Sequence, residues 1–298
     1  MCLACTHVKR EEAVKELQNR LLHKSVCDPS SSPTQACVRE IDWALVDMEG
    51  GTKLGEGVDC DGVYTCRVLL PGYDAGKWAI KMLKSGQVTP PMREAMGIQE
   101  ASAGLVSCVF MTSKAPWGLI YIYMNQGPLK RFVAKQRYTD PFHNQKAKLT
   151  GQLLAGMTAV HKGNNVHGDL HSSNVLVSLD RSSVSHTITV GISDLGRMTK
   201  VGHIKSGRFR TERQIKHYQA TYKQHPPEYS NQRTGITTYT KEGDIYALTR
   251  LLTTYFTPLP HKRTTHQRWY DLLKEGQSGD ASKRPTIQRL NDAFNEWC

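Results

Sequence analysis

Three residues in the middle of the chain have the side chains and the spacing that phosphoryl transfer from a nucleotide would need. Asp169 lies in the run His167-Gly168-Asp169-Leu170-His171, Asn174 follows it by five residues, and Asp194 begins Asp194-Leu195-Gly196. Such a transfer needs a carboxylate that orients the acceptor hydroxyl, and oxygen ligands for the Mg²⁺ ions that bind the phosphates. Asp169 can supply the first, and Asn174 with Asp194 can supply the second.

At these residues the sequence resembles the eukaryotic-type protein kinases, whose catalytic loop reads His-Arg-Asp-Leu-x-x-x-Asn and whose metal motif reads Asp-Phe-Gly. The resemblance covers about residues 43–298. It implies that ATP and Mg²⁺ bind, that Asp169 orients the acceptor hydroxyl or accepts its proton, and that Asn174 and Asp194 hold the metal. The implied activity is transfer of the γ-phosphoryl group of ATP to Ser or Thr hydroxyls of a protein, by a divergent member of the family.

The run Trp78-Ala79-Ile80-Lys81 resembles the kinase signature Val-Ala-Ile-Lys, which implies that Lys81 pairs with the α- and β-phosphates. The same resemblance implies a carboxylate partner for this lysine on the helix expected over 91–103. Glu94 fits that place best, because the helix then breaks at Gly104. Glu100 is the alternative, because the interval from Lys81 to Glu94 is short.

The run Leu54-Gly55-Glu56-Gly57 predicts a turn between two strands, where backbone N–H groups could lie over phosphates. A glycine pair in a hairpin is usually only a turn, but the kinase pattern gives it the role of a phosphate lid. Cys60 stands where that pattern has a third glycine, and Val63 comes one residue late. Val63 is still expected to cover the adenine.

The stretch 121–129 resembles the kinase hinge, with Tyr121 in the gatekeeper position. Adenine would be bound there by backbone groups, and we expect Tyr123 and Met124 to contact it. Ala79 and Leu176 are the other residues expected to contact the nucleotide. A plain buried strand that ends in a Gly-Pro turn accounts for the stretch 121–129 equally well.

Two residues depart from the catalytic-loop pattern. Gly168 stands where the pattern has Arg, so a phosphorylated activation segment could not form its usual arginine pair, and we expect regulation by other means or constitutive activity. His171 stands where the pattern has Lys, whose charge would stabilise the transferring group. With an unperturbed pKa of about 6.5, His171 would be mostly neutral near pH 7. We therefore expect activity that is weak, or that rises as pH falls toward about 6.5.

The wording Asp-Leu-His-x-x-Asn is also common in small-molecule phosphotransferases, which makes that class an alternative function. Three features of the C-terminal third resemble protein kinases and disfavour it. Pro226-Pro227-Glu228 resembles the motif that closes an activation segment, Asp244 resembles the helical Asp that braces the catalytic loop, and Arg284 is expected to pair with Glu228. A buried pair of this kind needs both members, since either alone would be an uncompensated charge.

A pseudokinase that binds partners without turnover is the other alternative. It is compatible with Gly168, with His171 and with the altered lid. It is disfavoured because all four of the residues expected to be essential are present: Lys81, Asp169, Asn174 and Asp194.

The elements that must position these residues fall into two groups. Strands are predicted at 43–46, 63–70, 78–82 and 118–124, whereas the apolar spacing beyond Asn144 is mostly helical. We expect an α+β, two-lobed fold of the protein-kinase type, with a small antiparallel sheet and one main helix over about 41–124 and a larger helical lobe over about 125–298. Residues 1–40 are expected to form a helix at 10–24 and a linker.

The amino-acid composition limits the kinds of binding partner and the cellular compartment that we expect. Lys and Arg total 39 against 27 Asp and Glu, a net charge of +12, which favours nucleic acid, an anionic membrane surface or an acidic protein. No Arg-rich tract or aromatic stacking pattern supports nucleic acid. Neither a secretory signal nor the roughly 18 apolar residues of a membrane span is found. We expect an intracellular protein, cytoplasmic or nuclear, with reduced cysteines.

Basic residues are frequent in the expected activation segment, beside the site where the acceptor would bind. A charge run of this kind is usually only a solvated loop, but here it could select an acidic or already phosphorylated protein substrate. The basic residues concerned are Arg197, Lys200, Lys205, Arg208, Arg210, Arg213 and Lys216.

Overall fold

The computed structural model describes residues 39–57, 60–73, 76–84, 104–135, 145–181, 186–206, 216, 225–230, 236–256 and 267–297. The chain forms two compact units. The N-terminal unit comprises Met1–Glu100 and Ser107–Tyr123, and the C-terminal unit comprises Ala101–Val106 and Met124–Cys298. The helices expected at 10–24 and 91–103 lie outside the described residues.

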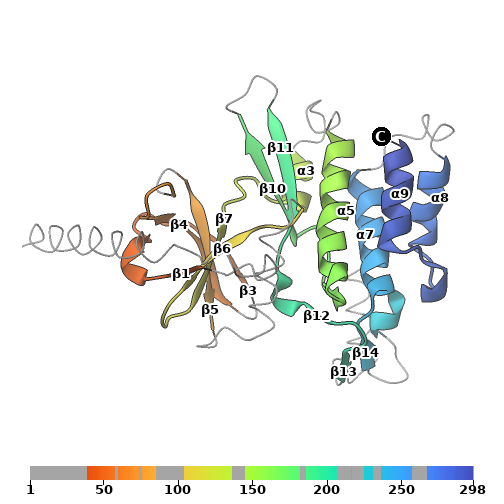
Figure 1. The fold of residues 1–298 in the computed structure, drawn as a ribbon, viewed down its shortest axis with the longest axis horizontal. Coiled ribbons are helices and arrows are strands. Elements are labelled where there is room, and N and C mark those ends of the chain that lie inside the picture. Colours follow the sequence, from red (N-terminus) through yellow and green to blue (C-terminus); the bar gives the residue numbers. More distant parts are fainter. Residues whose placement is uncertain are drawn as a thin grey trace, which may run out of the picture. The chain divides into compact units, whose positions relative to one another are not determined.

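A seven-stranded sheet forms the described part of the N-terminal unit (Figure 1). Its strands are β1 (Arg39–Ile41), β2 (Val46–Asp47), β3 (Lys53–Gly57), β4 (Cys60–Val68), β5 (Trp78–Leu83), β6 (Cys108–Thr112) and β7 (Gly118–Ile122). They are ordered β1-β6-β7-β5-β4-β2, and β3 pairs with β4 outside this path. The pairs are antiparallel except for β1 with β6, which is parallel. The strands predicted at 63–70, 78–82 and 118–124 are thus present, within a larger sheet than expected.

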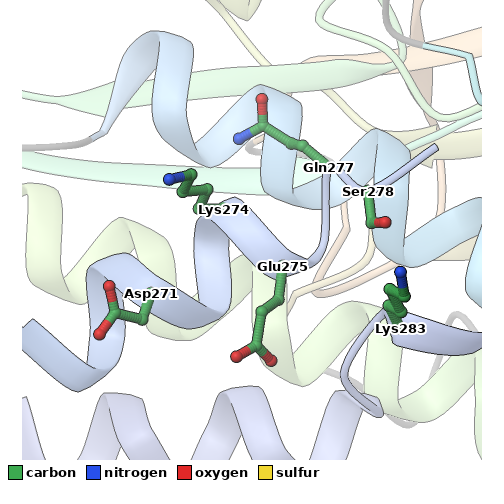
Figure 2. Close-up of a pocket in the computed structure, with 6 residues that line it drawn as sticks. All are labelled: Asp271, Lys274, Glu275, Gln277, Ser278 and Lys283. Carbon is green, nitrogen blue, oxygen red and sulfur yellow. The ribbon is translucent and has the colours of Figure 1, made fainter. Parts of the chain in front are cut away.

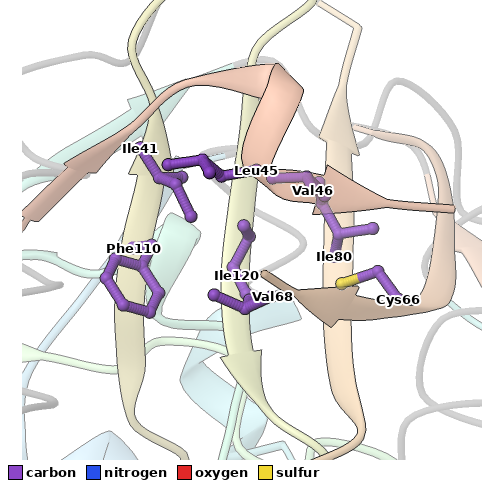
Figure 3. Close-up of a cluster of buried hydrophobic side chains, with 8 residues drawn as sticks. All are labelled: Ile41, Leu45, Val46, Cys66, Val68, Ile80, Phe110 and Ile120. Atoms are coloured by element: carbon purple, nitrogen blue, oxygen red, sulfur yellow. The ribbon is translucent and has the colours of Figure 1, made fainter. Parts of the chain in front are cut away.

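Hydrophobic side chains cover both faces of this sheet. The larger cluster is shown in Figure 3 and consists of Ile41, Leu45, Val46, Cys66, Val68, Ile80, Phe110 and Ile120. A smaller cluster consists of Leu83, Cys108, Met111 and Leu119. Ile80 and Leu83 lie three residues apart in β5, so they point to opposite faces of the sheet. Burial of each large side chain stabilises the fold by about 1.5–3 kcal/mol.

The strand predicted at 43–46 is wrong for its first three residues. Trp43–Leu45 forms a short 3₁₀ turn, and strand β2 begins only at Val46. The reason is the residue before the turn, because the Asp42 carboxylate accepts a hydrogen bond from the N–H of Ala44 at 2.9 Å. A side-chain cap of this kind favours a helical turn over an extended chain.

The turn predicted at Leu54–Gly57 is also wrong in its position. These residues belong to β3, and Gly55 and Gly57 pair across the ladder with Val63 and Cys60. The register shifts between these pairs, which marks irregular, bulged pairing. Glycine therefore serves here to bend a strand edge, and the connection to β4 lies at residues 58–59, outside the described residues.

The C-terminal unit contains helices and short strands. Its helices are α3 (Leu129–Lys135), α5 (Lys146–Lys162), α7 (Lys241–Tyr255), α8 (Gln267–Glu275) and α9 (Ile287–Trp297), with 3₁₀ turns η2 (Leu195–Arg197), η3 (Pro227–Ser230) and η5 (Ala281–Lys283). Its strands are β8 (Gly127–Pro128), β9 (Asn165–Val166), β10 (Val175–Asp180), β11 (Thr187–Ile192), β12 (Thr199–Lys200), β13 (Ile204–Ser206) and β14 (Ile236–Thr238).

Helix α5 confirms the helical pattern predicted beyond Asn144. The apolar positions of that pattern are all buried: Leu149, Leu153, Leu154, Met157, Val160 and His161. Helix α5 packs against β11 and against α9, and α8 packs against both α9 and α7 (Figure 1). The expected α+β fold is therefore confirmed. Within the described residues, no helix combines the length and the apolar character needed to cross a membrane.

The segment before Val106 approaches α5 so closely that it requires glycine. A Cβ atom at Gly104 would lie 1.8 Å from the carbonyl oxygen of Gln152 and 2.4 Å from the amide nitrogen of Gly156. The carbonyl oxygen of Gly104 also accepts a hydrogen bond from the N–H of Ile192 in β11 at 2.9 Å, and this bond would be lost if the segment moved away from α5. Gly104 thus fixes the distance between this segment and the helix that precedes the catalytic loop.

Substitution of Gly104 by Ala should therefore destabilise the protein strongly. We expect Gly104→Ala to lower the free energy of unfolding by about 3 kcal/mol or more, because backbone atoms of α5 must move. Gly279→Ala is the matched control, since nothing lies within 4 Å of its added Cβ atom, and its effect should stay within about 0.5 kcal/mol. Urea unfolding measures both values, and equal stabilities would contradict the close approach.

Candidate active site

Asp169 and Asn174 are joined directly in the loop between β9 and β10. The side-chain Nδ2 of Asn174 donates a hydrogen bond to the carbonyl oxygen of Asp169 at 2.8 Å. The backbone N–H of Asn174 donates to the carbonyl oxygen of His171, also at 2.8 Å. These two bonds close the turn that runs from Asp169 to Asn174.

Asp194 is brought to the same loop through the residue before it. The N–H of Ser193 donates to the carbonyl oxygen of Asn174 at 2.7 Å, and its hydroxyl donates to the same oxygen at 3.0 Å. On the other side, Nε2 of His167 lies 3.0 Å from the carbonyl oxygen of Ser193. Asp194 itself has left-handed backbone angles, φ 62° and ψ 43°, which Asp tolerates better than most residues. The structure therefore brings Asp169, Asn174 and Asp194 together.

A buried carboxylate holds the start of this loop. Asp244, in the first turn of α7, is 1% exposed. Its Oδ2 accepts a hydrogen bond from the N–H of His167 at 2.7 Å, and its Oδ1 accepts one from Gly168 at 2.9 Å. Nε2 of His161, at the end of α5, lies 3.1 Å from Oδ2. The brace predicted for Asp244 is thus present, and its buried carboxylate accepts two backbone N–H bonds beside the ring of His161.

The structure explains why position 168 is a glycine, which the sequence alone did not. Its φ is +72°, in the left-handed region, and an added Cβ atom would lie 2.8 Å from the ring of Tyr239. The N–H and carbonyl oxygen of Tyr239 bond to His203 and Gly202, at the start of the activation segment. Glycine therefore lets an aromatic ring of the following segment pack on the catalytic loop. The effect on phosphorylation stays a prediction.

His171 is half-buried in this loop, and its environment keeps it neutral. Burial lowers the pKa of His171 below its usual value, opposed by the nearby carboxylates of Asp169 and Asp194 and assisted by His225 and His167. Its Nδ1 also accepts a hydrogen bond from the N–H of Ser173 at 3.2 Å, which requires that nitrogen to carry no proton. The acidic rise in activity expected from the sequence would therefore begin below pH 6.5.

His225 is a residue of this site that sequence reasoning missed. It lies just before Pro226, is 6% exposed, and places its Nε2 3.2 Å from Oδ1 of Asp169. Its ring lies 6.3 Å from that of His171. A lone histidine before two prolines carries no local sign of such a contact, so only the fold could show it.

Glu228 and Arg284 form the predicted ion pair. Both guanidinium NH groups donate to the carboxylate, at 2.5 and 2.9 Å. Arg284 also donates to the carbonyl oxygens of Glu242 and Ser278, at 3.1 and 2.9 Å, and its guanidinium lies 4.9 Å from the ring centre of Tyr246. The arginine side chain is fully buried, whereas that of Glu228 is 31% exposed. The pair fixes the end of the activation segment to α7 and to the loop before η5.

The predicted nucleotide-binding residues of the N-terminal unit share one face of its sheet. Val63 pairs directly with Lys81 across β4 and β5, and Gly55 pairs with Val63 across β3 and β4. Ala79 lies two residues before Lys81 and pairs with Tyr121 in β7. Because side chains alternate between the faces of a strand, these groups project from the same side of the sheet.

The remaining predicted residues are placed as follows. Leu54 lies in β3 and is 39% exposed, and Gly57 ends that strand. Tyr123 and Met124 follow β7, and the carbonyl oxygen of Met124 accepts a hydrogen bond from Gly127. Leu176, in β10, pairs with Gly191 and Pro128. Glu94 and Glu100 lie outside the described residues, so the lysine partner stays a prediction.

A surface pocket of the C-terminal unit lies apart from the predicted site residues. It is lined by residues of α8, η5 and their connection: Asp271, Lys274, Glu275, Gln277, Ser278 and Lys283. Figure 2 shows that their polar ends point in different directions. The charges are mixed and do not converge on a point where a reacting group could be held, so we assign no chemistry to this pocket.

The Glu228 and Arg284 pair should contribute strongly to stability. Glu228→Gln would leave a buried guanidinium without its counter-charge and should lower the free energy of unfolding by about 3 kcal/mol. The control is Glu296→Gln, which removes the carboxylate paired with Arg268 on the surface, where the side chains are 61% and 55% exposed. That change should cost less than about 1 kcal/mol. Equal losses in urea unfolding would show that the buried pair is not special.

The neutral state of His171 gives a pH-dependent prediction. Because its pKa is lower in the folded chain, the unfolded chain binds more protons as pH falls below about 6.5. The stability that neutral His171 contributes is therefore complete above that pH and is lost in more acidic solution. In an NMR titration, His171 should titrate at a lower pH in the native chain than in urea. An equal or higher native midpoint would contradict the burial effect.

The comparison with known families agrees with this geometry. A family model described as protein tyrosine and serine/threonine kinase matches residues 48–278, most of the 298-residue chain. The matched region includes Lys81, the loop with Asp169 and Asn174, Asp194, and Glu228. Together with the α+β fold and the braced loop, this match confirms the family resemblance of the sequence. The chain belongs to the protein tyrosine and serine/threonine kinase family.

Proposed function

We propose that this protein is an active kinase that uses ATP and Mg²⁺ to phosphorylate Ser and Thr hydroxyls of proteins. The observation that carries the proposal is the connected set of Asp169, Asn174 and Asp194. Asn174 bonds to Asp169 through its side chain and to Ser193 through its carbonyl oxygen. These bonds fix the backbone at Asp169, at Asn174 and next to Asp194, so the three oxygen-bearing side chains that transfer would need start from one ordered loop.

The donor set fits Mg²⁺. The Nδ2 of Asn174 is used by the carbonyl oxygen of Asp169, so its amide oxygen Oδ1 is the atom that would bind the metal, together with the carboxylate of Asp194. In the described part of the chain, no group of three or more His, Cys, Asp or Glu side chains forms a metal cage. Mg²⁺ suits such a site, because it is commonly held by one or two protein oxygens plus water and phosphates. When bound, it would neutralise phosphate charge.

The nucleotide would be contacted by the shared face of the N-terminal sheet. Lys81 would pair its ammonium with phosphate oxygens, and Gly55 and Gly57 would allow the backbone of β3 to come near them. Val63 and Ala79 would contact the adenine, with Tyr123, Met124, Leu176 and Leu54 as the further contacts proposed. Glu94 is the proposed carboxylate partner of Lys81.

At the acceptor, the ionised Asp169 would receive the hydrogen bond of a Ser or Thr hydroxyl and orient its oxygen for attack. The backbone of Asp169 is held on both sides, because its N–H donates to Nδ1 of His167 at 3.2 Å and its carbonyl accepts from Asn174. Neutral His171 would offer an N–H and not a full positive charge. We therefore expect slower transfer than a lysine at that position would give.

The proposal is tested by transfer of labelled phosphate from ATP with Mg²⁺ to a panel of acidic, basic and tyrosine-containing proteins. Wild type should label Ser or Thr, and Asp194→Asn should lower the rate at least about 100-fold. Asp292→Asn is the matched control, because this aspartate is exposed on α9 and bonds only to Gln288 among the contacts described. Its rate should equal that of wild type.

The outcomes of this panel separate the alternative functions. Equal signals from wild type and Asp194→Asn would reduce the protein to a pseudokinase that acts by binding. Transfer to aminoglycosides or choline, with none to proteins, would support a small-molecule phosphotransferase. Labelled tyrosine would overturn the proposed Ser/Thr preference.

The proposed preference for acidic protein substrates rests on the basic residues of the activation segment. Of these, Lys200 lies exposed in β12 and Lys216 is exposed, whereas Arg208, Arg210 and Arg213 lie outside the described residues. Opposite charge at this position would raise the rate of encounter with acidic peptides. Equal rates on matched acidic and basic peptides would count against it.

A further inference from the structure

We infer that His225 is a positioning residue that holds the carboxylate of Asp169 through an Nε2–H contact to Oδ1. This inference rests on the proposed function, because it assigns a partner to the carboxylate that would receive the acceptor hydroxyl. It adds a histidine from the end of the activation segment to the residues that determine the geometry of transfer.

The contact is short and lies away from water. Nε2 of His225 is 3.2 Å from Oδ1 of Asp169, and the two side chains are only 2% and 11% exposed. The contact is electrostatic and is not a well-aligned hydrogen bond, and it favours the tautomer that carries a proton on Nε2. In such surroundings the attraction is stronger than it would be in water.

His225 acts on a different part of Asp169 from its neighbours in the loop. His167 and Asn174 bond to the backbone N–H and carbonyl oxygen of Asp169, at 3.2 and 2.8 Å, and so fix the position of its backbone. The contact from His225 is made to the carboxylate itself. It therefore restrains the rotation of the carboxylate that would receive the acceptor hydroxyl.

The histidine is itself held in place by its own segment. The carbonyl oxygen of Pro226 accepts a hydrogen bond from Tyr229 at 3.1 Å, and the rings of His225 and Tyr229 meet edge to face with centres 6.1 Å apart. Three residues after His225, Glu228 forms the bidentate pair with Arg284. The position of the Asp169 carboxylate therefore depends on whether the end of the activation segment is ordered. That part of the segment would also bind the acceptor.

The test measures steady-state phosphate transfer by the full chain, with the acceptor protein that the panel labels most strongly. We expect His225→Leu to lower kcat about 10- to 100-fold, because a small misplacement of a catalytic group costs that much, while KM for ATP changes less than twofold. His225→Gln should recover most of the rate, since its amide N–H reaches the same place. Asp292→Asn, the exposed control on α9, should behave as wild type.

A double substitution separates positioning from a general structural role. If His225 acts through Asp169, then His225→Leu in an Asp169→Asn background should cause no further loss of rate. A further loss as large as in wild type would overturn the inference, as would a Gln variant as slow as Leu, or an effect confined to KM.

Failure of the proposed function would remain distinguishable. If wild type transfers no phosphate, that proposal fails, and the contact is then tested by urea unfolding of His225→Leu, Asp169→Asn and the double variant. The shifts in midpoint should be non-additive, as expected for residues in direct contact. Additive shifts in a chain without activity would overturn the inference about His225 as well.

Discussion

The arrangement of the catalytic loop depends on one buried charge, the carboxylate of Asp244. Placed in the first turn of α7 and almost fully buried, it would be strongly unfavourable without partners. The N–H groups of His167 and Gly168 and the ring of His161 supply those partners. The loop therefore has to stay where its N–H groups meet Asp244, because any other position would leave a buried charge unmatched. The cost of burying an aspartate is what fixes the loop to the helical body.

Hydrogen bonds within the loop then position the residues that follow His167. His167 bonds to Ser193 through one ring nitrogen and accepts from Asp169 through the other, so its tautomer is set by its two partners. Asn174 likewise bonds to Asp169 on one side and to Ser193 on the other. The ring of His167 and the backbone carbonyl of Asn174 thus connect the catalytic loop to Ser193, which lies 26 and 19 residues further along the chain. Movement of Asp194 relative to Asp169 would break several of these bonds together, and the proposed metal ligands and the proposed base are therefore held in fixed geometry.

The parts of this arrangement that could be predicted are those whose chemistry is rare. An Asp, an Asn and a second Asp at fixed intervals seldom occur together without a shared task, and a buried Arg needs a carboxylate such as that of Glu228. The pairing of Glu228 with Arg284 and the brace of Asp244 are both confirmed.

Prediction was wrong where a local side-chain hydrogen bond outweighed the strand preference of the residues beside it. Trp43–Val46 has strand-forming side chains, yet the carboxylate of Asp42 caps a 3₁₀ turn. Contacts that exist only in the folded chain, such as that of His225, leave no pattern in the sequence.

Glycine at position 168, where the kinase pattern has arginine, is explained by the segment that packs on it. A side chain at this position would collide with the ring of Tyr239, and the backbone of Tyr239 bonds to both Gly202 and His203. Next to these bonds, β12 pairs with β9 and β13 pairs with β14. In the described residues, the start of the activation segment is therefore ordered by backbone hydrogen bonds and by a ring packed on a glycine. Bonds of this kind depend neither on salt nor on an added phosphate, whereas a pair between arginine and phosphate depends on both. The glycine at position 168 and the strand pairing beside it are thus parts of one packing arrangement, in which Tyr239 packs on the catalytic loop.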